Sequence, residues 1–322
     1  MSEKISELVR VRTWDDYVGQ AKLKAHLKIK IRAAIRDDRM FDHTLLVGPA
    51  GAGKSTIVDR IADELGDDLV VLPMPMKYDD FCYEIENFPG GVVFLDEIHN
   101  APRAFQERLQ VGMNDGHLID PYGDKISTHK LAFIGATTDA DQNMLLAPLI
   151  ERFKYKPSWD PYTTEEMAEI VAGMARRAKI NVPPEVCVGL AGAAGGNPRV
   201  VQDLVAAARD LDSVEMPVTV EAVLDLAGID ADGLTRNHLN YLHALHALRG
   251  VAGLATLKSV LGMNAAVVED LERTLVLRGF VRRTGSGRKL MAAGRAKIDQ
   301  AGDQTPGAAG RRRSDLGGTS VH

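Results

Sequence analysis

Short hydrophobic runs alternate with helical stripes along the first half of the chain. Each run is continuous and flanked by polar residues, which is the pattern of a strand buried on both faces. Before the first run, apolar side chains at every fourth position from Leu23 to Ile35 predict a helix over residues 20–36. Strands that alternate with helices indicate a doubly wound α/β domain with a parallel sheet. The predicted strands are residues 44–47, 69–72, 91–95 and 131–135.

The second half of the chain is dominated by helical patterns. A first, Ala-rich group begins after Thr163 or Thr164, either of which is a good N-cap. A linker at residues 228–233 leads to three more helices, followed at residues 279–290 by two short strands around a Gly-Ser-Gly turn. This is the order of elements in a winged helix. The predicted helices are residues 163–179, 185–194, 199–211, 220–227, 236–248, 254–261 and 265–277.

The segment between the first strand and its helix matches the phosphate-loop pattern G-x-x-x-x-G-K-[ST]. Its glycines let backbone N–H groups surround anionic oxygens, and the helix that follows adds the positive end of its dipole. Lys54 would reach the β- and γ-phosphates, and the Ser55 hydroxyl would bind Mg²⁺. The pattern therefore predicts binding of ATP with Mg²⁺. The predicted phosphate contacts are Gly48, Pro49, Ala50, Gly51, Ala52, Gly53, Lys54, Ser55 and Thr56.

A second acidic motif predicts that the nucleotide is hydrolysed. The apolar run at residues 91–95 ends in Asp96 and Glu97, about forty residues after the phosphate loop. Asp96 would hold Mg²⁺ through water, and Glu97 would orient and deprotonate the attacking water. By itself, such an acidic pair could also begin a solvated loop.

Three further positions favour a ring-forming ATPase of the AAA+ class. Thr138 ends an apolar strand and would contact the γ-phosphate as a sensor, while Arg199 opens a lid helix and could reach the same nucleotide. Arg152 follows an apolar segment at the edge of the domain, where it could reach the nucleotide of a neighbouring subunit. The alternative for Arg152 is a structural salt bridge, for example with Glu151.

Charge is distributed unevenly along the chain, whose net charge is −5. Residues 233–322 carry 14 Lys and Arg against 6 Asp and Glu, so a basic module follows an acidic body. This asymmetry indicates contact with nucleic acid in the basic module. A solvated basic tail is the alternative, because three arginines fall at residues 311–313. The predicted DNA contacts are Lys258, Arg282, Arg283, Arg288 and Lys289.

Other features of composition favour a cytoplasmic protein. No apolar stretch is long enough to span a bilayer, and the first residues lack the apolar core of a signal peptide. Cys82 and Cys187 do not have metal-ligand spacing, so we expect buried thiols in a reducing compartment.

The chain resembles the RuvB family, the bacterial motors that drive branch migration of Holliday junctions. The resemblance extends over nearly the whole chain, and the segment Asp96-Glu97-Ile98-His99 and the lead into the phosphate loop are specific to the family. The similar stretches are residues 16–20, 31–34, 41–46, 94–99, 134–138, 197–199 and 279–284.

This resemblance implies roles that composition and spacing do not give. Tyr17, Val18 and Tyr162 fall where the family holds adenine. Thr138 falls on its first sensor, Arg152 on its arginine finger and Arg199 on its second sensor. The resemblance further implies a hexameric ring on duplex DNA, a four-way junction as substrate, and a role in recombination and repair.

The chain also departs from the family pattern. Ala50, Ala52 and Ser55 stand where the family usually has Pro, Leu and Thr, although Ser55 keeps the hydroxyl needed for Mg²⁺. Asp139 and Ile150 replace arginines. Residues 113–130 cover the family's docking hairpin for the junction-binding protein RuvA, and here this segment is shorter and polar, which argues against docking through it. Such departures suit a relative encoded by a phage or mobile element.

Together these observations predict an α/β protein of four parts. We expect a P-loop ATPase core at residues 1–160, an all-α lid at 161–232, a winged helix at 233–300 and a disordered tail at 301–322. The favoured function is an ATP-driven DNA motor for junction migration. The alternative is a switch ATPase, such as a clamp loader, helicase loader or origin binder, in which ATP controls assembly. A motor hydrolyses ATP continuously on duplex DNA, whereas a switch hydrolyses about once per loading event.

Overall fold

The computed structural model describes residues 5–138 and 141–302. The chain folds into two compact units. The first runs to Ala227 and includes Ala231–Gly233, and the second contains Gly228–Asp230 and the chain from Leu234 onward. Most of the tail that we expected to be disordered lies outside the described residues, as does Asp139.

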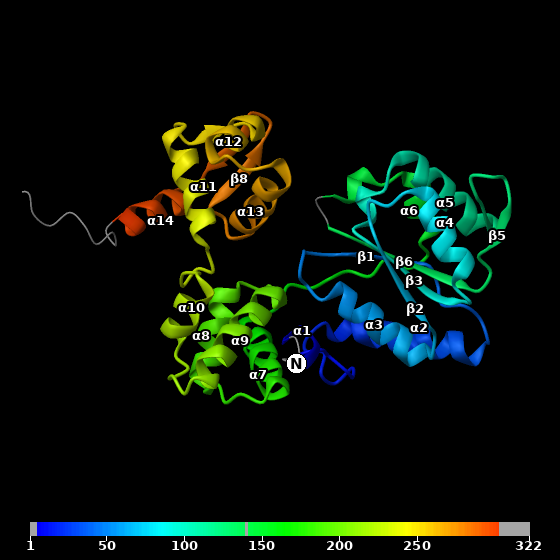
Figure 1. Ribbon diagram of the computed structural model, residues 1–322, viewed down its shortest axis with the longest axis horizontal. Coiled ribbons are helices and arrows are strands. Elements are labelled where there is room, and N and C mark those ends of the chain that lie inside the picture. The colour runs from blue at the N-terminus through cyan, green and yellow to red at the C-terminus, as the bar shows by residue number, and fades with distance from the viewer. Residues whose placement is uncertain (1–4, 139–140, 303–322) are drawn as a thin grey trace, which may run out of the picture. The chain divides into compact units, whose positions relative to one another are not determined.

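Four parallel strands form the sheet of the first unit, in the order β1-β6-β3-β2 (Figure 1). Both β1 and β3 pair with β6, so that Leu46 lies opposite Ala136 and Phe94 lies opposite Ile134. Because the strands are parallel, their carboxyl ends lie along one edge of the sheet. The predicted parallel sheet is confirmed. Its strands are β1 (Thr44–Val47), β2 (Leu69–Pro73), β3 (Gly91–Asp96) and β6 (Leu131–Thr137).

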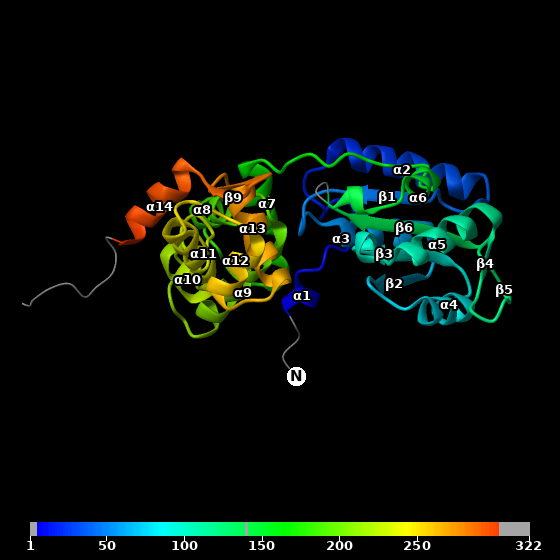
Figure 2. The same ribbon diagram turned by 90° about the horizontal axis from the view of Figure 1, so that it is seen from above.

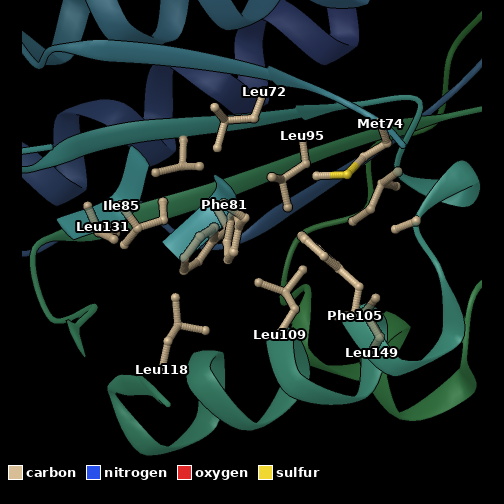
Figure 3. Packing of buried hydrophobic residues seen from close by; sticks show 14 of the residues in the cluster. Leu72, Met74, Phe81, Ile85, Leu95, Phe105, Leu109, Leu118, Leu131 and Leu149 are labelled. Atoms are coloured by element: carbon tan, nitrogen blue, oxygen red, sulfur yellow. The ribbon is translucent and has the colours of Figure 1, made fainter. Parts of the chain in front are cut away.

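Helices cover both faces of this sheet (Figures 1 and 2). Val92 and Phe94 of β3 pack with side chains of α2 and α3, whereas Val93 and Leu95 pack with α4, α5 and α6. Figure 3 shows the second of these clusters. Burying one such side chain contributes roughly 1.5–3 kcal/mol, which explains why the run is apolar on both faces. The helices are α2 (Ala21–Arg36), α3 (Lys54–Leu65), α4 (Tyr78–Asn87), α5 (Arg103–Asp115) and α6 (Ala147–Arg152).

A group of helices follows the sheet within the first unit. Its first helix begins at a capping box, in which Thr163 accepts the N–H of Glu166 and the Glu166 carboxylate accepts the N–H of Thr163. This arrangement satisfies two backbone donors that the first helical turn leaves free, and it confirms Thr163 as the N-cap. The helices are α7 (Thr164–Ala178), α8 (Pro184–Ala194), α9 (Pro198–Ser213) and α10 (Val220–Ala227).

Several short elements complete the first unit. An antiparallel hairpin, β4 (His117–Ile119) with β5 (Lys125–Ser127), occupies the segment that we expected to be shortened. In its turn, the Asp120 carboxylate accepts the N–H groups of Tyr122 and Asp124. The remaining short elements of this unit are α1 (Ile5–Leu8), η1 (Ile98–Asn100) and η2 (Gln142–Met144).

The second unit has the fold expected of a winged helix. Helices pack against a three-stranded sheet of order β7-β9-β8, in which β8 and β9 form the wing hairpin. Its core gathers Tyr241, Leu257, Leu275 and Phe280 from the helices and the turn before the wing. The elements are α11 (Arg236–Ala247), β7 (Val251–Ala252), α12 (Leu254–Leu261), α13 (Ala265–Leu277), β8 (Val281–Thr284), β9 (Gly287–Leu290) and α14 (Ala292–Gly302).

Across the described ranges, the helices are all too short or too polar to cross a membrane. Cys82 and Cys187 are free and buried, as expected. Burial raises the pKa of both thiols, so both stay protonated near neutral pH.

His43 joins β1 to β6 through a hydrogen bond that requires a neutral ring. Its Nδ1 accepts the backbone N–H of Phe133 at 3.0 Å, and the two rings lie 5.4 Å apart. Burial, with a smaller contribution from the positive charge of Lys154, lowers the pKa of His43 from 6.5 to about 4. Protonation would remove the acceptor and place a charge beside the sheet.

We predict that this histidine makes the first unit less stable in mild acid. The unfolded chain binds the proton near pH 6.5 and the folded chain only near pH 4. The contribution of neutral His43 is therefore complete above pH 6.5 and is lost as the pH falls toward 4, by up to about 3 kcal/mol. His43→Asn keeps an acceptor near the position of Nδ1 but does not titrate. Its free energy of unfolding, measured with urea, should therefore fall less between pH 7 and pH 4.5 than that of the parent protein. Equal losses in the two proteins would contradict this account.

Candidate functional site

The predicted phosphate loop connects β1 to α3 at the carboxyl edge of the sheet. Gly51 and Gly53 both have positive φ, of 75° and 95°. At Gly53 a Cβ would also lie 2.8 Å from the Tyr17 hydroxyl oxygen, so a side chain there would meet both strain and a clash. Gly53 is the N-cap of α3, and Lys54 and Ser55 are its first residues. The free N–H groups of this helix therefore face the loop.

Lys54 is held inside the loop. Its side-chain ammonium donates hydrogen bonds to the carbonyl oxygens of Gly48 at 2.8 Å and Pro49 at 2.9 Å, and the residue is only 6% exposed. These contacts fix a positive charge beside the N-terminus of α3. Such a charge in a ring of backbone donors favours a polyphosphate.

Asp96 and Glu97 lie at the end of β3, across the cavity from the loop. Glu97 adopts a left-handed backbone, with φ 51° and ψ 45°, and its N–H donates to Asp96 Oδ1 at 3.1 Å. A residue other than glycine pays of order 1 kcal/mol for this conformation, which is concentrated at functional sites. The two carboxylates share a cavity of about 220 Å³ with the phosphate loop. The residues lining it are Ala50, Gly51, Gly53, Lys54, Ser55, Thr56, Asp96, Glu97, Met174, Pro198, Arg199 and Gln202.

The helical group closes this cavity through the start of α9. The Asn197 side chain caps this helix by accepting the N–H of Arg199 at 3.0 Å. It also covers the loop, since a Cβ built on Gly51 would lie 2.1 Å from Asn197 Oδ1. The N-termini of α3 and α9 therefore meet at one cavity, and both favour negative charge there. Arg199 lines the cavity, as its predicted role requires.

Sequence reasoning missed three residues of this cavity, Met174, Pro198 and Gln202. Gln202 lies three residues after Arg199 in α9, and Met174 lies in α7. Residues three apart share a helix face, so the spacing alone could have suggested Gln202. The position of Met174 depends on how α7 packs against the rest of the unit, and the sequence carries no comparable signal for it.

The residues predicted to hold adenine lie together beside the loop. Tyr17, Val18 and Tyr162 line a small adjacent pocket with Ile170 and Met174. The Tyr162 hydroxyl donates to the Ala52 carbonyl at 3.1 Å, and burial raises its pKa and that of Tyr17. Both tyrosines therefore remain protonated and neutral, which suits contact with an uncharged base.

Thr138 and Arg152 lie outside the residues that line the cavity. Thr138 follows β6, the strand next to β3, and its hydroxyl donates to Asp141 Oδ2 at 2.6 Å. Arg152 is exposed at the last residue of α6. Within the described residues it forms no ion pair, so the alternative of a salt bridge with Glu151 gains no support. The Lys156 ammonium donates to the carbonyls of Ile150 and Phe153 and steadies the end of this helix.

The five predicted DNA contacts fall into different environments in the second unit. In the wing, Arg282 pairs with Lys289 and Arg283 pairs with Arg288, so each pair occupies one face of the hairpin. Arg282 and Lys289 are exposed, whereas Lys258 of α12 is half-buried. Arg283 is also exposed, at 46% of its side chain, whereas Arg288 is half-buried.

The second pair binds a buried acid. Glu272 of α13 is fully buried and accepts Arg288 Nε at 2.8 Å, Arg283 Nε, and the Tyr241 hydroxyl at 3.4 Å. These contacts tie the wing to α13. Breaking a buried pair by removing one partner typically costs 3–5 kcal/mol, which applies to Arg288, whereas Arg283 is 46% exposed and contributes less. We assign both arginines a structural contribution that sequence reasoning did not anticipate.

The chain matches known proteins over both units. It matches the family model of the Holliday junction DNA helicase RuvB P-loop domain over residues 9–158 and that of the RuvB C-terminal winged helix domain over residues 231–298. The Holliday junction branch migration complex subunit RuvB of Kosmotoga olearia is 32% identical over 305 residues, which cover 89% of this chain and 88% of the relative. The subunit from Lacticaseibacillus casei is 32% identical over 319 residues, covering 94% of both.

A solved structure gives the same picture. The RuvB Holliday junction branch migration motor of Thermotoga maritima is similar with a TM-score of 0.79 at 28% identity, over 91% of this chain and 98% of that one. The first unit combines a phosphate loop, two acids at the end of a strand and a helical lid, and a winged helix follows it in the chain. These features define a P-loop ATPase coupled to a nucleic-acid-binding module. The chain belongs to the RuvB family. It binds nucleotide and is an ATP hydrolase, and its expected fold class is confirmed.

We predict that two substitutions separate nucleotide binding from hydrolysis. Lys54→Ala removes the ammonium that would neutralise the phosphates and should abolish binding. Glu97→Gln keeps the shape of the side chain without its basicity, so it should bind nucleotide and fail to turn over. Calorimetry and steady-state phosphate release measure the two effects, with Glu86→Gln, an exposed acid of α4, as the control. Unchanged turnover in Glu97→Gln would remove this residue from the catalytic role.

Proposed function

We propose that this chain is an ATP-driven DNA motor that migrates four-way junctions in homologous recombination and repair. The observation that carries the proposal is the match of both RuvB family domains in one chain, with the phosphate loop, the acidic pair and the lid arginine lining one cavity. The curated relatives are named as subunits of the Holliday junction branch migration complex. Nearly complete coverage of these relatives supports a shared activity.

In the proposed reaction, the first unit binds ATP and activates water. The loop N–H groups and Lys54 would hold the phosphates, and Glu97 would take a proton from the water that attacks the γ-phosphate. A hydroxyl and a carboxylate are the hard oxygen donors that Mg²⁺ prefers, so Ser55 and Asp96 fit this ion. When bound, Mg²⁺ would offset negative charge on the β- and γ-phosphates.

We assign the remaining nucleotide contacts to five further residues. Thr138 would meet the γ-phosphate and Arg199 would contact the phosphates from the lid, while Tyr17, Val18 and Tyr162 would hold adenine. The start of α9 over Gly51, with Arg199 lining the same cavity, supports the lid role.

A hexameric ring would complete the site. Arg152 is exposed at the end of α6 and lies outside its own cavity, which suits a residue that serves the neighbouring subunit. A guanidinium supplied in this way stabilises charge on the transferring phosphoryl group.

The proposed partners are duplex DNA, the junction and a RuvA-type protein. The curated relatives' printed name refers to a branch migration complex. The short β4–β5 hairpin has an acidic turn with exposed Tyr122 and no apolar tip, so we do not assign docking of the RuvA-type protein to it. We place the activity in the cytoplasm, a reducing compartment consistent with two free cysteines.

A branch-migration assay tests this function. A synthetic four-way junction should be converted to two duplexes when the chain and ATP are present, with more conversion when RuvA is added. Glu97→Gln and a non-hydrolysable ATP analogue are the controls, and both should prevent conversion. ATP-independent conversion, or none with or without RuvA, would overturn the proposal.

We predict that the exposed face of the wing carries the backbone contacts. Arg282→Ala together with Lys289→Ala should weaken duplex binding and reduce the slope of log affinity against log salt by about 0.9 per lost contact. Arg283→Ala should mainly lower the thermal stability of the second unit, because it leaves Glu272 less well paired. Arg32→Ala, an exposed arginine of the first unit, is the control. An unchanged salt slope in the double variant would exclude this face.

We also predict that Arg152 acts across a subunit interface. Arg152→Ala and Lys54→Ala should each be inactive alone, because one lacks the finger and the other the loop cation. Mixed rings should recover some ATPase activity where an intact finger meets an intact loop. The exposed Lys154→Ala serves as the control and should remain active. An active Arg152→Ala protein, or mixtures that stay inactive although subunits exchange, would refute a finger supplied in trans.

A further inference from the structure

A buried histidine lies behind the proposed catalytic carboxylate. The left-handed backbone of Glu97 turns the chain directly into η1, which brings His99 back toward the end of β3. The ring is 6% exposed, and its Nε2 lies 3.4 Å from Glu97 Oε2 and 3.7 Å from Asp141 Oδ2. One ring nitrogen therefore faces two carboxylates.

The other ring nitrogen contacts the neighbouring strand. His99 Nδ1 lies 3.1 Å from the hydroxyl oxygen of Thr137, which is fully buried at the end of β6. The same hydroxyl lies 3.4 Å from the Thr138 carbonyl oxygen; when it donates to the closer Nδ1 instead, Nε2 carries the ring proton and can donate. Asp141 also accepts the Thr138 hydroxyl at 2.6 Å. A continuous series of polar contacts thus runs from Thr138 through Asp141 and His99 to Glu97.

We propose that His99 is a positioning residue that couples the predicted sensor Thr138 to Glu97. This inference rests on the proposed roles of those two residues. Nε2 lies near both carboxylates, so its single proton can be donated to only one of them, Glu97 or Asp141, at a time. While Thr138 donates to Asp141, that carboxylate is partly satisfied and His99 interacts with Glu97. When Thr138 turns toward a γ-phosphate, Asp141 becomes the stronger acceptor for His99, and Glu97 is released toward the water.

A histidine that only packs in the core would not need polar contacts at both ring nitrogens. A residue that only fills space could be replaced by any side chain of similar size, whereas the proposed role depends on a donor at the position of Nε2. A glutamine amide reaches that position, and an asparagine amide reaches only the position of Nδ1. This pair of substitutions therefore distinguishes coupling from packing.

The test compares His99→Asn with His99→Gln. Both should bind nucleotide with the affinity of the parent protein and keep its KM for ATP. His99→Asn should lower kcat on the order of 10²-fold, the cost of a misplaced catalytic group, and His99→Gln should restore kcat to within a few-fold of the parent. A fully active His99→Asn, or equal losses in the two variants, would overturn the proposal.

A second variant keeps the test decisive if His99→Asn does not fold. Asp141 is partly exposed, at 26% of its side chain, so Asp141→Asn should fold normally. It should lower kcat without changing nucleotide affinity, because the competing carboxylate is gone. Combined with His99→Asn, where that protein folds, it should cause little further loss. An unchanged kcat in Asp141→Asn, or losses that simply multiply, would contradict the coupling.

Glu97→Gln separates this inference from the proposed function. If Glu97→Gln still hydrolyses ATP, the catalytic role of Glu97 fails and the inference fails with it. If Glu97→Gln is inactive while His99→Asn is fully active, the catalytic role stands and only the coupling is wrong.

Discussion

The pairing of β6 with both β1 and β3 is the constraint on which the nucleotide site depends. This register aligns three strand ends, so the phosphate loop after β1, the acids at the end of β3 and Thr138 after β6 lie along one edge. The apolar faces of the strands maintain the register, because a shift by one residue would turn buried side chains toward the wrong helices. The same packing that stabilises the sheet therefore places the chemistry.

Charged groups also shape the sites of the helical group and of the winged helix. The start of α9 brings a second helix N-terminus and Arg199 to the cavity, so the nucleotide can contact both parts of the first unit. In the second unit, buried Glu272 offsets part of the positive charge of Arg283 and Arg288 on one face of the wing, while Arg282 and Lys289 are exposed on the other. Positive charge is thus directed to a surface that can meet DNA.

The sequence was sufficient for features that depend on local pattern. The apolar runs predicted the four strands of the parallel sheet. The phosphate-loop spacing predicted a nucleotide site, and the cavity at that place is lined by Lys54 and Glu97. Features that depend on tertiary contact were missed. Arg283 and Arg288 look like surface cations in the sequence, because their partner Glu272 is distant along the chain. The contact of His99 with Glu97 depends on a left-handed turn at a residue other than glycine, which no local pattern signals.

The central claim is that this chain is a motor rather than a switch. The most direct measurement is the time course of phosphate release per chain, with excess ATP and closed circular duplex DNA. A motor should release phosphate linearly over many turnovers per chain, and the duplex should accelerate that steady rate. A burst of about one phosphate per chain, followed by little further release, would contradict the account and favour a loading switch.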